Sequence, residues 1–358
     1  MRKSKNTVTV FYACCVALAG CSPSLYKNIS YDSVKARVIT DTVRWDTDDP
    51  AIWVHPTKRD ESLVIGTDKE TDGALYAFDL QGKIVRRVGG LLRPNNVDIA
   101  YGFSFGEGLI DIAVVTEREA QRIRVFSLPD LEPLDAGDLI VFDGDKSRAP
   151  MGIALYSRPR DGALFVFVGG KSGPADGYLH QYRIVGDEDG TIRMEFVRAV
   201  GRYSGKKEIE SIAVDSESGY LYYSDETVGV RKYHADPDVE EADKELALFA
   251  TKGFKRDHEG ISIYKTGDST GYIIISDQQA NNFHIYSREG SVGNPHEHRL
   301  LKIVHASTLD SDGSEVTNVS LSPVFPSGLF VAMSADKTFH YFSWDDIAGG
   351  DLKKVTGE

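Results

Sequence analysis

The sequence predicts an all-β fold, a six-bladed propeller with mostly four-stranded antiparallel blades, and two observations support this prediction. First, the chain beyond its N-terminal segment has almost no amphipathic helical period, and short alternating apolar runs broken by Gly, Asp and Asn prevail. Second, three strand-like patterns recur in the same order six times. A repeat of about 50 residues with several strands per unit is typical of a propeller, in which each unit forms one blade.

The first pattern is an acidic or polar residue followed by an apolar strand. Because a polar residue recurs at the start of the strand in five of the six units, we expect these starts to share one environment. The six copies are "DDPAIWV" from Asp48, "NNVDIAY" from Asn95, "APMGIALY" from Ala149, "EIESIAV" from Glu208, "RDHEGISIY" from Arg256 and "GSEVTNVSL" from Gly313.

The second pattern is an apolar strand that ends in polar residues, and the third is a short strand that closes on an aromatic residue. The second comprises "LVIGTDK" (63–69), "IAVVTER" (112–118), "LFVFVGGK" (164–171), "LYYSDE" (221–226), "IIISDQ" (273–278) and "LFVAMSAD" (329–336). The third closes on Phe78, Phe126, Tyr182, Tyr233, Tyr286 and Phe342.

A fourth, more variable strand such as "KIVRRV" (83–88) completes each predicted blade. The last unit has little chain left for such a strand. We therefore expect "KARVITDTV" (35–43) to supply it, so that the two ends of the chain close the ring within a single domain over residues 34–358. The alternative is a pair of stacked β-domains, which the regular recurrence of all three patterns disfavours.

The N-terminus has the pattern of an export signal. Residues 1–20 contain three basic residues followed by an apolar run, as in a signal peptide. Leu18-Ala19-Gly20-Cys21 is similar to the bacterial lipoprotein cleavage box. Lipid on Cys21, followed by a polar tether over residues 21–33, would hold the protein at a membrane surface without spanning it. We expect an exported, membrane-anchored lipoprotein; the alternative is an ordinary signal peptide that ends near a cysteine.

Net charge excludes a class of partner. The formal net charge is −13, and it becomes −16 when the three basic residues of segment 1–20 are removed. Non-specific nucleic-acid binding needs a basic surface, so no nucleic-acid partner is expected.

Cys14 and Cys15 lie within the predicted signal, which leaves no pair for a disulfide in the mature chain. We expect a monomer.

Propeller geometry brings polar residues of all six units to one face. The innermost strand of a blade starts at this face, and the next strand runs antiparallel and ends there. The predicted rim collects Asp48, Asp49, Asn96, Asp98, Glu210, Asp257, Glu259 and Glu315 from the first strands. From the second strands it collects Lys69, Arg118, Lys171, Asp225, Glu226, Asp277 and Gln278.

Carboxylates at this density require cations. Oxygen ligands without cysteine, and with His258 as the one rim histidine, suit Ca²⁺ better than zinc. Lys69, Arg118 and Lys171 end the second strand in three successive units, which favours an anion held between bases and metal. The alternatives are turn-capping Asp, Asn and Glu residues and solvated Lys and Arg side chains.

These segments together resemble the β-propeller phytases, the alkaline calcium-dependent phytate hydrolases. The resemblance covers nearly all of the predicted mature chain. It rests on "DDPAIWV", "NNVDIAYGF", the Glu210 segment, "LYYSDE", "DHEGISIY", "SDQQ" and "FPSGLFVAM". It implies a six-bladed propeller with several calcium ions at one rim, and a phosphoric monoester hydrolase of the 3-phytase type. The implied substrates are phytate (inositol hexakisphosphate) and other inositol phosphates, attacked directly by a metal-bound water.

The resemblance also implies residue roles. Candidate ligands of the catalytic calcium ions are Asp48, Glu210, Glu226, Glu259 and Glu315. Asp49, the Val97 carbonyl, Asp257 and Gln278 match ligands of a neighbouring calcium. Lys69 and Arg118 match phosphate contacts at the cleavage site, and Lys171 matches a contact for a second phosphate. Glu210 or Glu226 would orient the attacking water.

Three positions depart from the family pattern. Glu70 replaces a lysine, Met151 a phosphate-contacting tyrosine, and Ser172 a glutamate. We expect a working cleavage site with altered preference among phosphate esters. Two alternative functions are a lactonase-like calcium propeller, which does not need three bases beside the metals, and a non-catalytic surface propeller that binds a polyanion or a protein.

Overall fold

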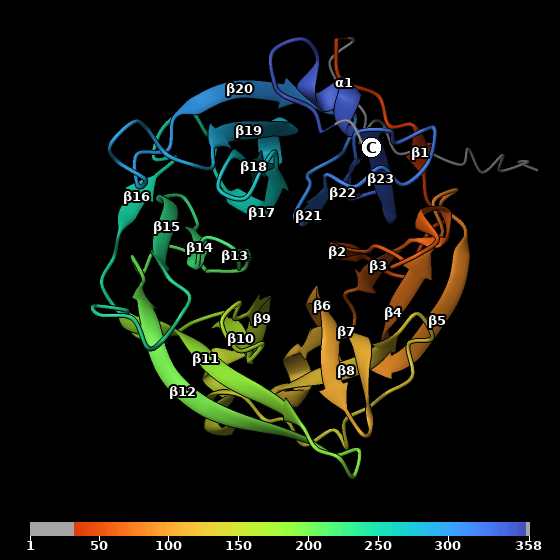
Figure 1. The fold of residues 1–358 in the computed structure, drawn as a ribbon, viewed down its shortest axis with the longest axis vertical. Helices are drawn as coiled ribbons and strands as arrows, with labels where there is room; N and C mark the ends of the chain where they lie inside the picture. The colour runs from red at the N-terminus through yellow and green to blue at the C-terminus, as the bar shows by residue number, and fades with distance from the viewer. Residues whose placement is uncertain (1–31, 356–358) are drawn as a thin grey trace, which may run out of the picture.

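The computed structural model describes residues 32–355, and these form six antiparallel sheets around a central axis (Figure 1). Five of these sheets have four strands and one has three. This arrangement confirms the predicted six-bladed propeller. The predicted signal peptide and Cys21 lie outside the described residues. Within residues 32–355 no helix combines the length and hydropathy needed for a transmembrane span.

The six blades follow one another along the chain. Blade 1 has β2 (Thr47–Trp53), β3 (Leu63–Asp68), β4 (Gly73–Phe78) and β5 (Ile84–Leu91), and blade 2 has β6 (Pro94–Phe105), β7 (Gly108–Glu117) and β8 (Arg122–Leu128). Blade 3 has β9 (Pro150–Ser157), β10 (Leu164–Gly170), β11 (Asp176–Gly186) and β12 (Ile192–Arg202). Blade 4 has β13 (Ile212–Asp215), β14 (Tyr220–Asp225), β15 (Gly229–His234) and β16 (Ala247–Phe249).

Blade 5 has β17 (His258–Lys265), β18 (Gly271–Asp277), β19 (Asn282–Ser287) and β20 (Leu300–His305). Blade 6 has β21 (Ser314–Thr317), β22 (Leu329–Ser334), β23 (Thr338–Ser343) and β1 (Val38–Ile39), and the helix α1 (Trp344–Ala348) follows β23. Short 3-10 helices occupy Arg59–Glu61, Arg118–Ala120, Phe142–Gly144, Lys146–Arg148 and Gln278–Ala280. The first strand of each blade lies beside the axis in Figure 1.

The two ends of the chain close the ring, as the sequence predicts. β1 pairs antiparallel with β23, with Val38 opposite Tyr341. Beyond β1, the Thr40 hydroxyl accepts a hydrogen bond of 2.9 Å from the Phe339 backbone N–H. Blade 6 therefore draws its outermost strand from the start of the chain.

Apolar side chains between neighbouring blades hold the ring together. Between blades 6 and 1, one core cluster joins β3 and β4 to β22 and β23, with Val64, Phe78, Val331 and Phe339 buried in it. Apolar residues on both faces of a strand serve two such interfaces, because each blade packs against a neighbour on either side. This explains the near-continuous apolar runs in the second strands.

Blade 2 is the three-stranded sheet. Where a fourth strand would lie, the chain forms isolated bridges, Arg122 with Ile140 and Phe126 with Pro133. The Pro133 position has no backbone N–H to donate to a ladder, which is consistent with a broken outer edge.

We expect the closing interface to tolerate no added volume at Gly66. A Cβ at this position of β3 would overlap the fully buried ring of Phe339 in β23. Gly66→Ala should lower the free energy of unfolding by roughly 1–3 kcal/mol, measured by denaturant titration. Gly108→Ala is the matched control, because its Cβ would meet no atom within 4 Å. Equal stabilities of the two variants would contradict the proposed packing.

Candidate functional site

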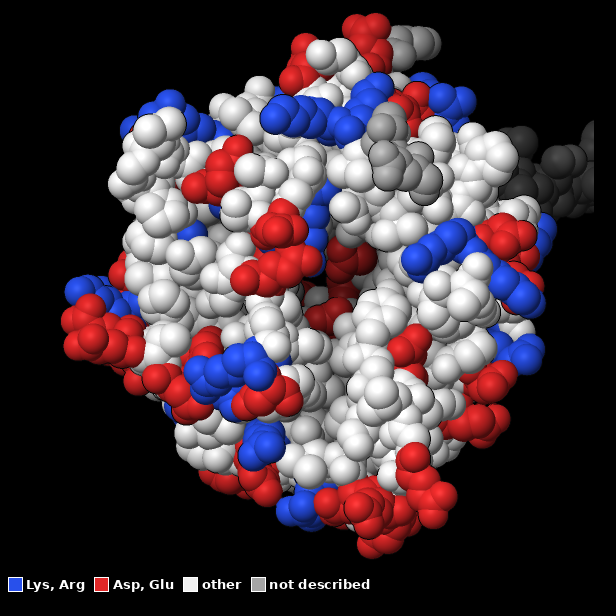
Figure 2. Space-filling view, in the orientation of Figure 1, with Lys and Arg blue, Asp and Glu red and all other residues white. Residues whose placement is uncertain are grey.

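The sequence-predicted polar residues gather at the rim and along the axis, where Figure 2 shows acidic side chains inside the central hollow. A repeated backbone hydrogen bond fixes the rim. In every blade, the N–H of a residue just after the second strand donates to a carbonyl in the segment that precedes the first strand. The pairs are Lys69–Asp46, Arg118–Arg93, Lys171–Ala149, Glu226–Glu208, Gln278–Asp257 and Ala335–Leu309.

Acidic residues that end the second strands cap the neighbouring rim loops. The Asp68 carboxylate accepts from the backbone N–H of Trp45 and of Asp46, and Glu117 accepts from Leu92. In the same way Asp225 accepts from Ser204 N–H, and Asp277 accepts from Lys255 N–H. Asp225 and Asp277, which the sequence assigns to the rim cluster, therefore act as loop caps in this structure.

A local break in the strand register explains how adjacent residues face different surroundings. The ladder between the first and second strands shifts between Thr47 and Pro50, between Pro94 and Val97, and between His258 and Ile261. A bulge at the strand start removes the strict alternation of side chains. Asp48 and Asp49 lie within the first of these shifts, so both are free to point toward polar surroundings.

Lys69 lies at the centre of the first group of rim residues, the Lys69 cluster (Asp48, Lys69, Asn95, Glu210 and Asp312). The Lys69 ammonium forms an ion pair with Asp48 and lies 3.4 Å from Asp312 Oδ2. The Asn95 amide bridges two carboxylates, because it donates to Asp48 Oδ2 at 2.6 Å and to Glu210 Oε1. The cluster thus combines side chains from blades 1, 2, 4 and 6.

Burial and charge act in opposite directions in the Lys69 cluster. Burial alone would lower the pKa of Lys69, but Asp48, Glu210 and Asp312 outweigh it and raise that pKa. Burial raises the pKa of Asp48 and brings the pKa of Asp312 to about 6, although Lys69 opposes both shifts. Lys69 is therefore a fixed cation among carboxylates that are costly to ionise.

A second lysine lies in the neighbouring Lys207 cluster (Lys207, Glu226, Asp257 and Glu259). Lys207 forms an ion pair with Glu226, and its ammonium lies 3.0 Å from Asp257 Oδ2 and 3.8 Å from Glu259 Oε1. Burial raises the pKa of Glu226 to about 8 against the effect of Lys207, and burial together with Glu226 raises the pKa of Glu259. The three carboxylates come from blades 4 and 5.

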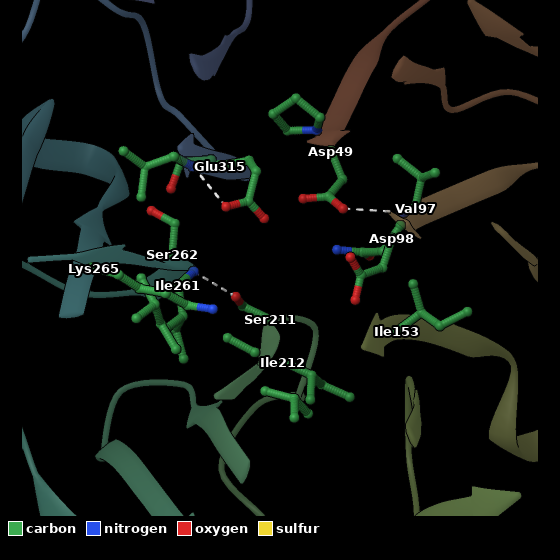
Figure 3. A pocket seen from close by; sticks show the side chains of 17 residues that line it. Asp49, Val97, Asp98, Ile153, Ser211, Ile212, Ile261, Ser262, Lys265 and Glu315 are labelled. Atoms are coloured by element: carbon green, nitrogen blue, oxygen red, sulfur yellow. Dashed lines mark hydrogen bonds between the residues drawn. The ribbon is translucent and has the colours of Figure 1, made fainter. Parts of the chain in front are cut away.

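The third group lines a cavity of about 210 Å³ on the axis, the axial cavity (Figure 3). Figure 3 shows the carboxylates of Asp49 and Glu315 facing one another across this cavity, with Asp98 beside Asp49. Asp49 Oδ2 accepts a 3.0 Å hydrogen bond from the Val97 N–H. Burial raises the pKa of Glu315 to about 8 and that of Asp98 to about 6.

The structure divides the predicted ligand sets in a way the sequence does not. Glu315 lies in the axial cavity, apart from the Lys69 and Lys207 clusters in which Asp48, Glu210, Glu226 and Glu259 lie. Asp49 and Val97 also line the axial cavity, whereas Asp257 belongs to the Lys207 cluster. The Gln278 side chain donates to Asp312, and the neighbouring Gln279 amide donates to Asp257 Oδ2 at 2.6 Å.

The three predicted bases occupy different settings. Lys69 is largely buried in its cluster, and Arg118 Nη1 lies 3.5 Å from Asn95 Oδ1 at its edge. Lys171 is half exposed and pairs with Glu208 at 2.9 Å. Glu208 in turn offers a carboxylate oxygen close to those of Glu210 and Glu226, so Lys171 borders the acidic groups.

The positions that depart from the family pattern have defined surroundings. Met151 is buried, and its carbonyl accepts a 2.6 Å hydrogen bond from the Thr116 hydroxyl. Glu70 accepts a hydrogen bond from the Thr71 N–H, and the Ser172 hydroxyl donates to the Ser147 carbonyl. Each of these three hydrogen bonds joins a side chain to a backbone group.

Sequence reasoning missed Asn95, Asp312, Lys207, Glu208 and Gln279 as members of the site. Asp312 belongs to "DSDG" (310–313), a partial calcium-loop pattern that is more typical of a turn, although it runs into Glu315 and so allows a shared site. Lys207 precedes Glu210 by three residues, outside the repeated pattern that starts at Glu208. A search of the loops that precede the first strands, not only of the strand ends, would have included Asp312 and Lys207.

The donor set fits calcium. Carboxylate and amide oxygens dominate the rim, and the described residues contain no cysteine. Ligand oxygens of Glu226, Asp257 and Glu259 lie within 4.8 Å of one another, as do those of Glu208, Glu210 and Glu226. Glu226 Oε1 and Asp257 Oδ1 are buried, and no donor within residues 32–355 reaches them. A buried oxygen without a donor is costly unless a cation or water fills the place.

Asp48 and Asn96, together with Glu210, Glu259 and Asp312, line a smaller cavity of about 10 Å³, which lies between the two clusters. A volume of this size is about that of one water-sized sphere. A single small ion therefore has space between the clusters without a change of fold.

Comparison with known proteins gives one family. A family model described as "Phytase" matches residues 6–350. The 3-phytase of Bacillus subtilis (strain 168) is 28% identical over 329 residues, which cover 84% of this chain and 80% of that protein. Among solved structures, Kuenenia stuttgartiensis hydrazine synthase matches with a TM-score of 0.49 and 12% identity over 82% of this chain and 83% of that one. A structural similarity at this level carries no information about function.

The raised carboxyl pKa values predict a pH dependence of stability in chelator. With folded-state pKa values of about 8 for Glu226 and Glu315, the folded protein keeps protons that the unfolded chain releases above about pH 4. The stabilisation is therefore complete at low pH and is lost as the pH rises through about 8. The melting temperature, followed by circular dichroism, should fall between pH 5 and pH 8.

Glu315→Gln is the control for this trend, because a neutral amide mimics the protonated acid at every pH. The variant should show a shallower decline over the same range. A melting temperature that rises from pH 5 to pH 8 in chelator would contradict the assignment of protonated carboxyls.

Proposed function

The chain belongs to the phytase family, and from this premise we propose that it hydrolyses phosphate monoesters of phytate in a calcium-dependent reaction by direct attack of water on phosphorus. The observation that carries this proposal is the Lys69 cluster beside the Lys207 cluster. Together they set the fixed ammonium of Lys69 next to oxygen ligands for metal. Substrate phosphates need a cation, and calcium needs oxygen ligands.

The proposed calcium ligands are the carboxylates of the two clusters and of the axial cavity, with Asp48, Glu210, Glu226, Asp257 and Glu259 nearest to the lysines. Asp49, the Val97 carbonyl, Gln278 and Glu315 complete the proposed set. Bound calcium would lower the pKa of water, polarise the phosphoryl oxygens and offset the charge of the substrate.

The chain's own cations have a separate role in this proposal. Lys69 and Arg118 would hold the phosphate to be cleaved, and their positive charges would stabilise the additional negative charge of the transition state. The planar Arg118 guanidinium suits bidentate contact with phosphate, and the Lys69 ammonium acts as a point charge. Glu210 and Glu226 are the proposed residues that orient the attacking water.

Lys171 is the proposed contact for a second phosphate of the same substrate. Its ammonium is half exposed and is held by Glu208, so it can turn toward a ligand by exchanging one anionic partner for another. Met151 offers no hydroxyl to such a phosphate, and Glu70 carries a negative charge where the family pattern has a lysine. We therefore propose a preference among inositol phosphates that differs from that of relatives with tyrosine and lysine there.

Phosphate release tests the proposed function. Purified protein should release inorganic phosphate from phytate when Ca²⁺ is present and lose this activity in chelator, measured with a colorimetric phosphate assay. Lactones and phytate tested side by side separate this reaction from a lactonase. Binding of phytate without release under any divalent cation would support a non-catalytic role and overturn the proposal.

Lys69→Met tests the phosphate role of Lys69. Loss of one preorganised charge at the reacting centre should reduce kcat/KM for phytate by about 100-fold or more. Lys58→Met, which removes the same charge from an exposed lysine paired with Glu61, should leave kcat/KM unchanged. Circular dichroism establishes that both variants are folded, and unchanged turnover in folded Lys69→Met would refute the role.

We also propose that the protein is exported and held at a membrane surface by lipid on Cys21. The basic and apolar N-terminal sequence and the Leu-Ala-Gly-Cys box support this proposal. Cys21→Ala should move the protein from the membrane fraction to the soluble fraction after expression in a bacterial host. An unchanged distribution between the two fractions would contradict lipid anchoring at Cys21.

A further inference from the structure

Lys207 has no role in the proposed catalysis, yet its ammonium lies within the Lys207 cluster. It contacts the carboxylates of Glu226, Asp257 and Glu259 at once. These are also the three residues whose ligand oxygens lie close enough together to hold one metal ion. The ammonium and a calcium ion would therefore compete for the same oxygens.

Space and charge allow one of the two cations at a time. Calcium binds oxygen at about 2.3–2.6 Å, so an ion held by oxygens within 4.8 Å of one another lies at the centre of the group. The ammonium that contacts Glu226 and Asp257 in the structure would then lie within a few ångströms of a divalent cation. Repulsion at that separation, in partly buried surroundings, is strong.

Lys207 can leave the cluster without a change of fold. Its side chain is 35% exposed, whereas that of Lys69 is 16% exposed. It projects from the rim loop before β13, and the flexible side chain of lysine reaches solvent by rotation about its own bonds. Lys69, by contrast, is held deep in its cluster by Asp48 and Asp312.

One ammonium does not satisfy the cluster. Glu226 Oε1 and Asp257 Oδ1 remain buried without a donor while Lys207 is in place. Calcium takes six to eight oxygen ligands and can contact both. The cluster is therefore incompletely compensated by lysine, which favours exchange for a divalent ion.

We propose that Lys207 is a displaceable counter-ion: its ammonium neutralises the Glu226–Asp257–Glu259 group in the metal-free protein, and calcium binding at that group expels it toward solvent. This inference rests on the proposed calcium site. Lys207 lowers the apparent calcium affinity, because each binding event must first break its ion pairs. It also stabilises the protein when calcium is scarce.

Calcium titration of the metal-free protein tests the competition. Isothermal titration calorimetry should give a dissociation constant for Lys207→Met at least about tenfold lower than for the wild type, since no ion pair must be broken. The metal-free Lys207→Met protein should also melt several degrees lower. Lys207→Gln is a second variant that keeps a hydrogen-bond donor if Lys207→Met does not fold.

Lys206→Met is the matched control. Lys206 is the exposed neighbour of Lys207, and its ammonium makes no ion pair within residues 32–355. Both substitutions remove one positive charge, so the change in net charge is the same. Its calcium dissociation constant and metal-free melting temperature should equal those of the wild type. Tightening of equal size in both variants would show a general charge effect and overturn the proposal.

Acylation of lysine reports the displacement directly. An amine-reactive ester, followed by peptide mass spectrometry, should label Lys207 faster after calcium is added, while Lys206 reacts at the same rate with and without calcium. Unchanged or slower labelling of Lys207 would refute displacement. Wild-type protein that binds no calcium refutes the proposed function itself, whereas binding without a Lys207 effect refutes this inference alone.

Discussion

Repulsion among buried carboxylates is the constraint on which the rim depends. Four blades deliver Asp48, Glu210, Glu226, Glu259 and Asp312 to a small region where water cannot fully solvate them. Two lysines from outside the acidic set, Lys69 and Lys207, offset part of this charge, and protonation offsets more. The arrangement resembles that of a charged active site more than that of a stabilising core, because buried ion pairs contribute little net stability. A rim of this kind adds little to stability and is suited to binding ions.

Much of the fold follows from the sequence because its signals are local. The alternation of apolar residues fixes each strand, and the sixfold recurrence fixes the number of blades, down to the outer strand that β1 supplies. The exact membership of the site does not follow. Asp48 and Asp49 are adjacent, yet a register shift sends one to the Lys69 cluster and the other to the axial cavity. Contacts such as Asp312 with Lys69 cross between blades, and one repeat alone contains no signal for them.

The separation of roles at the rim also depends on these shifts and caps. Asp68, Glu117, Asp225 and Asp277 stand one residue before a rim position and hold a loop by accepting backbone hydrogen bonds. The residue that follows, such as Lys69 or Glu226, is then free to face the clusters. A capping acid thus directly precedes a functional residue in the sequence, which is why the strand-end pattern overstated the size of the acidic cluster.

The closure of the ring has a consequence for the order of events during folding. The Lys69 cluster joins blade 1 to blade 6 through Asp312, and it also needs Asn95 of blade 2 and Glu210 of blade 4. A nascent chain that lacks its last blade cannot assemble this group of side chains, however well its first blades are formed. Formation of the Lys69 cluster is therefore a late event that reports completion of the whole circle, and a partly translated chain has no complete Lys69 cluster.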